Sequence, residues 1–177
     1  GGLLAALLLG CGENPSTSAA LDTVLELRPL AGRPLAHAMA MLIPEAWEGH
    51  TGMSAERKAF YEYHASIMEP WDGPAAVAFT DGRQIAAMLD RHGLRPARYV
   101  VTADDFVVLS SDAVALEIQA SNIRGKGPLA LGKMNIVHNQ QVRVLDDDAV
   151  KNEHAMGWPY PTRVATRSMD LASVIVP

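Results

Sequence analysis

Cysteine is almost absent from this sequence, with Cys11 the single example among 177 residues. One cysteine cannot form an internal disulfide, so the chain does not follow the pattern of a disulfide-stapled secreted domain. Positive charge is also scarce, because 15 lysine and arginine residues stand against 20 aspartate and glutamate residues. No basic patch interleaved with aromatic residues is found, which argues against nucleic-acid binding. A reducing cytosol is the expected compartment.

Long apolar runs are missing too. The longest, residues 3–9, has seven residues, whereas a transmembrane helix needs about 20, so no transmembrane span is expected. The run leads into Leu8-Leu9-Gly10-Cys11, which has the form of a lipoprotein cleavage box, so a lipid anchor at Cys11 is one interpretation. Neither a methionine nor a positively charged segment precedes the run. This favours the other interpretation, a divergent apolar segment over residues 1–15.

The remainder, residues 16–177, suits one globular domain. Hydrophobic residues make up 49% of the chain, which is enough for a core, and no repeat, linker or low-complexity segment divides it. Helical spacing and capping residues predict helices that begin near Ser16, Leu35, Ser54 and Asp146. The first of them is expected to be interrupted by Pro29, and the second to stop before Pro44.

The middle of the chain is patterned as antiparallel strands. Residues 77–79 and 84–89 flank Asp81-Gly82, a dipeptide that tolerates positive φ and indicates a two-residue hairpin turn. Further strands are expected over residues 98–102 and 106–110. Together these strands predict a β-meander. With its flanking helices, the predicted fold class is α+β.

The turn between the second and third of these strands has an unusual composition, Asp90-Arg91-His92-Gly93-Leu94-Arg95-Pro96. Gly93 is expected to hold a positive φ, which glycine adopts without steric penalty. The two arginines are expected to pair with Asp90 or with main-chain carbonyls. We therefore interpret a set of five residues as a structural motif rather than a ligand site: Asp90, Arg91, Gly93, Arg95 and Pro96.

Two patterns bear on metal binding. Asp146-Asp147-Asp148 is a run of three carboxylates, but a solvated helix start, which the helix dipole favours, is the preferred interpretation. The six histidines show no H-x-x-x-H spacing and the chain has no C-x-x-C motif. No metal site is therefore expected.

Three blocks of sequence occur in an order that is similar to a known family. They are L-I-P-E-A-W at residues 42–47, F-Y-E-Y-H at 60–64 and M-E-P-W-D-G-P-A at 68–75. With the D-R-x-G-L-R-P turn and the S-S-D-x-x-A-L of residues 110–116, they resemble class II glutamine amidotransferase domains, above all those of glutamate synthases. The resemblance covers roughly residues 16–171. It implies the C-terminal part of an αββα sandwich of the N-terminal-nucleophile type, incomplete in this chain.

The resemblance implies a domain that releases ammonia from glutamine for glutamate biosynthesis, joined in the full enzyme to domains that hold FMN and an iron–sulfur cluster. Such domains use an N-terminal cysteine as nucleophile and its own α-amine as base. An arginine holds the substrate carboxylate and an Asn-Gly pair stabilises the oxyanion. In the family these groups precede the matched region, and the 177 residues show no match to them. Neither cofactor is expected in this chain, nor is activity of the chain alone.

Two residues near the start bear on glutamine. Where glutamate synthases have Ser-Asp-Ser, with the aspartate on the glutamine ammonium, this chain has Ser16-Thr17-Ser18. A hydroxyl gives a neutral hydrogen bond about half as strong as a charged one, so Thr17 is a weak substrate-binding candidate. Cys11-Gly12 is similar to the Cys-Gly that opens these enzymes. It lies only six residues before Thr17, so a catalytic Cys11 is the less favoured interpretation.

Three functions remain open on the sequence alone. They are part of a glutaminase domain, a non-catalytic split-domain or interaction module, and a lipid-anchored envelope protein. Glutamine binding is expected only if an upstream segment completes the domain. Missing neighbour strands would leave a sheet edge and an apolar face uncovered, which favours self-association or a partner chain.

Overall fold

The computed structural model describes residues 17–30, 32–71, 73–111, 117–138 and 143–167, so Cys11 and Asp112 lie outside the described residues. The helices are α2 (Thr17–Leu30), α3 (Leu35–Leu42), α4 (Ala55–Ile67), α5 (Asp147–Met156) and α6 (Tyr160–Arg167). The strands are β1 (Ala76–Thr80), β2 (Gln84–Leu89), β3 (Arg98–Thr102), β4 (Val107–Ser110), β5 (Ile123–Pro128), β6 (Met134–His138) and β7 (Arg143–Leu145). The α+β class is confirmed.

The strands form two antiparallel sheets, with the orders β1-β2-β6-β7 and β4-β3-β5. Both predicted hairpins are present, β1 with β2 and β3 with β4. The expectation of one continuous meander was wrong, because β3 does not follow β2 in the same sheet. The free edge of β2 pairs instead with β6, which places Ala86 opposite Ile136. The turn that starts at Asp90 therefore carries the chain from one sheet to the other.

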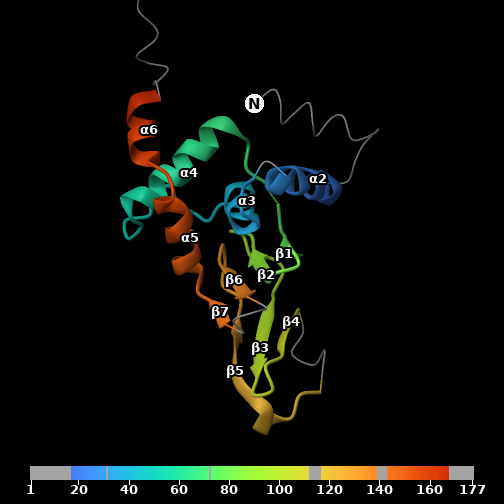
Figure 1. Cartoon of the computed structure of the whole chain (residues 1–177). Helices are drawn as coiled ribbons and strands as arrows, with labels where there is room; N and C mark the ends of the chain where they lie inside the picture. Colours follow the sequence, from blue (N-terminus) through green and yellow to red (C-terminus); the bar gives the residue numbers. More distant parts are fainter. Residues whose placement is uncertain (1–16, 31, 72, 112–116, 139–142, 168–177) are drawn as a thin grey trace, which may run out of the picture.

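The main core lies between the helices and one face of the four-stranded sheet. Side chains alternate along β2, so Ala86 and Met88 join the helices in this core, while Ala87 and Leu89 belong to a smaller cluster on the other side. Met134 and Ile136 of β6 extend the main core and are almost fully buried. Figure 1 shows the helices gathered at one end of the molecule and the three-stranded sheet extending from the other.

The helices follow from short local signals. Helix α3 has the predicted bounds and is buried along nearly its whole length, as its apolar sequence requires. Helix α4 begins after Ser54, whose Oγ accepts a hydrogen bond from the Arg57 main-chain N–H at 3.3 Å. Helix α2 corrects the prediction, because it continues past Pro29 to Leu30. None of the helices that the structure describes has both the length and the apolarity needed to cross a bilayer.

Candidate functional site

Asp90 organises the turn between β2 and β3. Its side chain is buried, and its carboxylate accepts hydrogen bonds from the main-chain N–H groups of Ala75 (3.1 Å), His92 (2.7 Å) and Gly93 (3.3 Å). Its main-chain carbonyl accepts a further bond from Gly132 N at 3.1 Å. One residue thus joins the start of β1, its own turn and the loop before β6.

The other residues of the turn motif are exposed or tightly placed. Gly93 has the expected positive φ, +61°. A Cβ atom built on Gly93 would lie 1.8 Å from Leu131 Cδ2, so a side chain here would also push on the neighbouring loop. Arg91 and Arg95 are exposed, and Arg91 Nε donates to His92 Nε2 at 3.3 Å. The structural interpretation of these two arginines stays a prediction.

Thr17 and Cys11 are the two residues that the family resemblance linked to glutamine. Thr17 is the first residue of α2, the helix that the sequence predicted to begin near Ser16. Cys11 lies outside the described residues. The structure therefore does not bring Thr17, Cys11 and the turn motif together into one described site.

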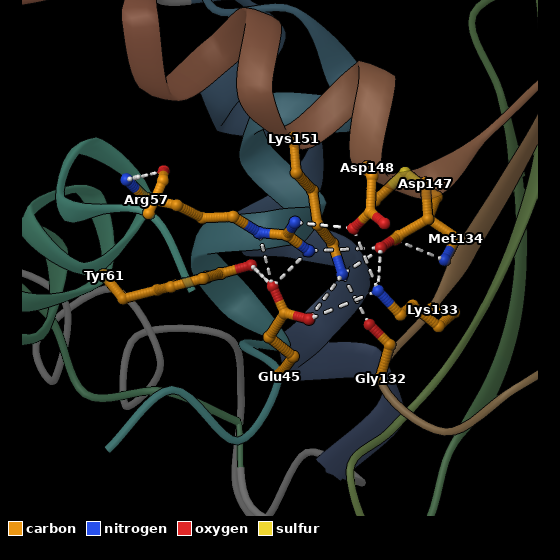
Figure 2. Close-up of polar contacts among 10 residues, drawn as sticks. Glu45, Arg57, Tyr61, Gly132, Lys133, Met134, Asp147, Asp148 and Lys151 are labelled. Atoms are coloured by element: carbon orange, nitrogen blue, oxygen red, sulfur yellow. Dashed lines mark hydrogen bonds and ion pairs between the residues drawn. The ribbon is translucent and has the colours of Figure 1, made fainter. Parts of the chain in front are cut away.

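A cluster of charged side chains is the most extensive polar feature among the described residues, and sequence reasoning missed it (Figure 2). Arg57 of α4 lies at its centre: Nε donates to Glu45 Oε1 at 2.8 Å, Nη1 to Asp148 Oδ1 at 2.6 Å and Nη2 to Asp147 Oδ2 at 3.2 Å. Tyr61, one turn further along α4, donates its hydroxyl to Glu45 Oε1 at 2.9 Å. The cluster therefore links α4, α5 and the loop after α3.

Two lysines complete the cluster. Lys133 Nζ lies 2.9 Å from Asp147 Oδ2 and 3.1 Å from Asp148 Oδ1. Lys151 Nζ lies 2.7 Å from Asp147 Oδ1 and donates to the Gly132 carbonyl at 2.6 Å. Asp147 Oδ1 also accepts the main-chain N–H of Met134 at 2.8 Å, which fixes α5 to the first residue of β6.

The cluster is electrically balanced, with three carboxylates (Glu45, Asp147, Asp148) against three cations (Arg57, Lys133, Lys151). Burial opposes the charge on Arg57, but its hydrogen bond to Asp148 and the charge of Glu45 outweigh this and raise its pKa. Hydrogen bonds from Arg57 and Lys133 lower the pKa of Asp148 to about 2. Burial lowers the pKa of Lys151, although Asp147 and Glu45 oppose the shift.

The prediction of a solvated helix start at residues 146–148 was wrong for Asp147, whose exposed fraction is 3%. Its partner Arg57 is 90 residues earlier in the chain, so the sequence around α5 gives no sign of this contact. The spacing of Asp147 and Lys151, four residues apart on one helix, was the one local signal available. Across the described parts of the chain, no group of three or more His, Cys, Asp or Glu is arranged to hold a metal ion.

Two of the cavities among the described residues lie beside the charged cluster and between the two sheets. One, of about 410 Å³, opens beside the charged cluster and is lined by Glu45, His50, Ser54, Arg57, Lys133 and Asp148. Each of the cluster's charges is already paired within it, so this cavity offers no uncompensated charge to a ligand.

The other cavity is an apolar groove of about 430 Å³ between the two sheets. It lies on the face of the four-stranded sheet that carries Ala87, away from the helices. Ile85 of β2 is 54% exposed and Phe106, just before β4, is 65% exposed; both line the groove together with Leu109. Exposed apolar side chains gathered in this way are typical of interaction surfaces and ligand grooves.

The family described as class-II glutamine amidotransferases matches residues 4–162. The glutamate synthase (NADPH) large chain of Bacillus subtilis is 50% identical over 145 residues, which cover 82% of this chain and 10% of the relative. The glutamate synthase (NADH) of Schizosaccharomyces pombe is 40% identical over 161 residues, 90% of this chain and 8% of the relative. The ferredoxin-dependent glutamate synthase of Antithamnion sp. is 45% identical over 147 residues, 82% of this chain and 10% of the relative. The chain thus spans about a tenth of the length of these relatives.

Replacing Gly93 by valine is expected to destabilise the chain by more than about 1 kcal/mol, because a β-branched residue is penalised at positive φ. Denaturant unfolding of Gly93→Val measures the change. Gly125→Val is the matched control, since Gly125 has open space around it and no positive φ. Equal losses in the two variants would show that the backbone conformation at Gly93 does not matter.

Replacing Arg57 by methionine is expected to cost about 3–5 kcal/mol, because it leaves the buried carboxylates of Glu45 and Asp147 without their main cation. The matched control is Arg83→Met at an exposed position of the β1–β2 turn, where a change within about 0.5 kcal/mol is expected. Chemical denaturation followed by circular dichroism compares the two variants. A loss under 1 kcal/mol in Arg57→Met would contradict a stabilising role for the cluster.

Proposed function

We propose that this chain, which belongs to the class-II glutamine amidotransferase family, is the C-terminal part of the glutamine-cleaving domain of a glutamate synthase. The observation that carries the proposal is 40–50% identity to glutamate synthases over at least four fifths of the chain. Its place in metabolism is then glutamate biosynthesis, through ammonia released from glutamine. A reducing cytosol is the compartment that fits this role.

The part that this chain plays in the reaction is structural support rather than bond cleavage. Catalysis in this class needs a cysteine thiol and a free α-amine on the same residue. Cys11, the one cysteine of the chain, lies six residues before Thr17, too near for the nucleophile and the ammonium ligand of the family pattern. Thr17 itself offers a neutral hydroxyl where the family pattern has a carboxylate, which weakens the contact with the ammonium.

The cofactors of a complete glutamate synthase belong to other parts of the enzyme. Iron–sulfur clusters are held by several cysteine thiolates, and this chain has one cysteine. The donor set therefore does not fit a cluster. We place FMN in the same separate domains, which receive the ammonia.

The groove between the sheets is the surface where the rest of the amidotransferase domain docks. Ile85, Phe106 and Leu109 are exposed apolar residues of this groove. The relatives are about ten times longer than the matched segment, so they contain ample additional chain to cover it. We propose that strands of the preceding amidotransferase segment fill this groove, because β1 and β4 are edge strands among the described residues and both line it.

The purified 177-residue chain is expected not to hydrolyse glutamine. Loss of the nucleophile and its base removes the covalent route, and one oxyanion donor alone is worth about 100-fold to 1000-fold in rate. Ammonia release from millimolar glutamine is measured for the chain, for Cys11→Ser and for Thr17→Asp. Thr17→Asp is expected to stay inactive, since a better ammonium ligand supplies no nucleophile. Release above background that disappears in Cys11→Ser would make Cys11 a nucleophile and overturn the proposal.

In the absence of its docking segment, the chain is expected to self-associate through the groove. Multi-angle light scattering should give a mass above that of one chain, and Ile85→Thr with Phe106→Ser should lower it toward the monomer. Leu94→Ser is the matched control, because Leu94 is 74% exposed but does not line the groove. A monodisperse wild-type monomer with a cooperative melt would count against an uncovered docking face.

A further inference from the structure

A further cavity, of about 450 Å³, lies between α2, the start of α3 and the turn that joins β1 to β2. Figure 1 shows α2 beside this hairpin. Side chains alternate along β1, so Ala78 lines the groove between the sheets, whereas Phe79 packs against the main core on the helical side. The cavity is therefore separate from that groove. We call it the acidic hollow, and its lining includes Asp22, Leu25, Glu26, Leu35, Phe79 and Asp81.

The less exposed part of this lining is apolar. Leu25 of α2 and Phe79 of β1 are half-buried at the margin of the main core, and Leu35 at the start of α3 is half-buried beside them. Their accessible surface is still in contact with water. An aliphatic group placed on it would be favoured, because the contact removes apolar surface from water.

Three exposed carboxylates belong to the same lining, Asp22 and Glu26 from α2 and Asp81 from the hairpin turn. Asp22 and Glu26 are four residues apart, so they lie on the same side of the helix, where like charges repel. Across the described parts of the chain, no ion pair or hydrogen bond involves the carboxylate of either residue. No described residue that lines the hollow carries a positive charge. The hollow therefore holds negative charge that nothing within it compensates.

Asp81 is held in place by its own turn. Its Oδ1 accepts the main-chain N–H groups of Arg83 at 2.9 Å and of Gln84 at 2.8 Å. These bonds, that from Arg83 above all, hold the pKa of Asp81 below its ordinary value, so the group keeps its negative charge. Both bonds go to Oδ1, which leaves Oδ2 for a ligand. The side chain of Arg83 is exposed and does not line the hollow.

An apolar surface edged by uncompensated carboxylates fits a side chain with an aliphatic stem and a cationic end. Arginine fits better than lysine, because its guanidinium is planar, is weakly hydrated and can donate to more than one carboxylate at once. A metal ion does not fit, since among the described residues no group of His, Cys, Asp or Glu is arranged to hold one.

We propose that the acidic hollow is a docking site for an arginine side chain of a partner polypeptide. The stem of the arginine lies on Leu25 and Phe79, and its guanidinium donates to the carboxylates of the hollow. Its positive charge also relieves the repulsion between Asp22 and Glu26. The site does not depend on which segment fills the groove between the sheets, because the two cavities have no described lining residue in common.

The test uses a blocked tripeptide, acetyl-Ala-Arg-Ala-amide, whose binding to the 177-residue chain is followed by saturation-transfer NMR on the peptide signals. This method works whether or not the chain self-associates. So small a probe is expected to bind with a dissociation constant of the order of 1 mM. The same peptide with citrulline, which has the shape of arginine without its charge, should bind at least about fivefold more weakly. High salt should weaken the arginine peptide, because exposed charges are screened.

The double variant Asp22→Asn with Glu26→Gln removes the two carboxylates of α2 at exposed positions. It should weaken binding of the arginine peptide at least about fivefold and leave the citrulline peptide unchanged. Glu62→Gln with Glu69→Gln is the matched control, because it removes two exposed carboxylates that do not line the hollow. The control should bind the arginine peptide like wild type. The melting temperature of each variant shows that it is folded.

The comparison of arginine with citrulline needs only the wild-type chain, so it decides the matter even if a double variant fails to fold. Tighter binding of the arginine peptide that is lost in Asp22→Asn with Glu26→Gln alone supports the docking site. Absence of binding, equal binding of the two peptides or equal losses in the two double variants would overturn it. A lysine peptide that binds as tightly as the arginine peptide would overturn the choice of arginine.

Discussion

Arg57 holds the helical layer in one arrangement on the sheet. Its guanidinium binds Glu45 from the loop after α3 and Asp147 from the start of α5, while its main chain belongs to α4. Removing such charges from water is expensive, and the expense is offset only when every partner is in place. A shift of α5 along β6 would break both the Arg57 contacts and the bond from Met134 N to Asp147. The cluster therefore fixes the register between helices and sheet, in addition to any stability that it supplies.

The two faces of the four-stranded sheet differ in their exposure to solvent. Met88 and Ile136 are sealed beneath the helices, whereas Ile85 of the same strand as Met88 is more than half exposed in the groove. Successive side chains of a strand point to opposite faces of the sheet, so a strand that is covered on both sides is apolar on both faces. A sheet patterned in this way is suited to the middle of a layered structure. This pattern accords with a segment that spans a tenth of its relatives' length.

Local signals in the sequence predicted the local structure well. The hairpin of β1 with β2 and helix α3 have the expected positions, because turn chemistry and apolar runs act over a few residues. The strand register centres the turn on Gly82 and Arg83, one residue later than the expected Asp81-Gly82. Non-local features were not predictable in this way. Strand β5 contains Gly125 and Gly127, and glycine disfavours a strand in a prediction from sequence. In the structure Tyr99 of β3 lies opposite Gly127 and covers it. Asp147 was misjudged for the same reason, since its partner is 90 residues away.

The first turn of α2 shows that the position of a helix and the chemistry of its first side chain are determined separately. Thr17 opens α2, and α2 is anchored to the core by Leu21 and Val24, which are 7% and 3% exposed. This anchoring depends on apolar burial, which a change at the first helical residue leaves intact. The helix therefore stays in place whether its first residue carries a hydroxyl or a carboxylate. Packing thus keeps α2 in place independently of the side chain at its first position.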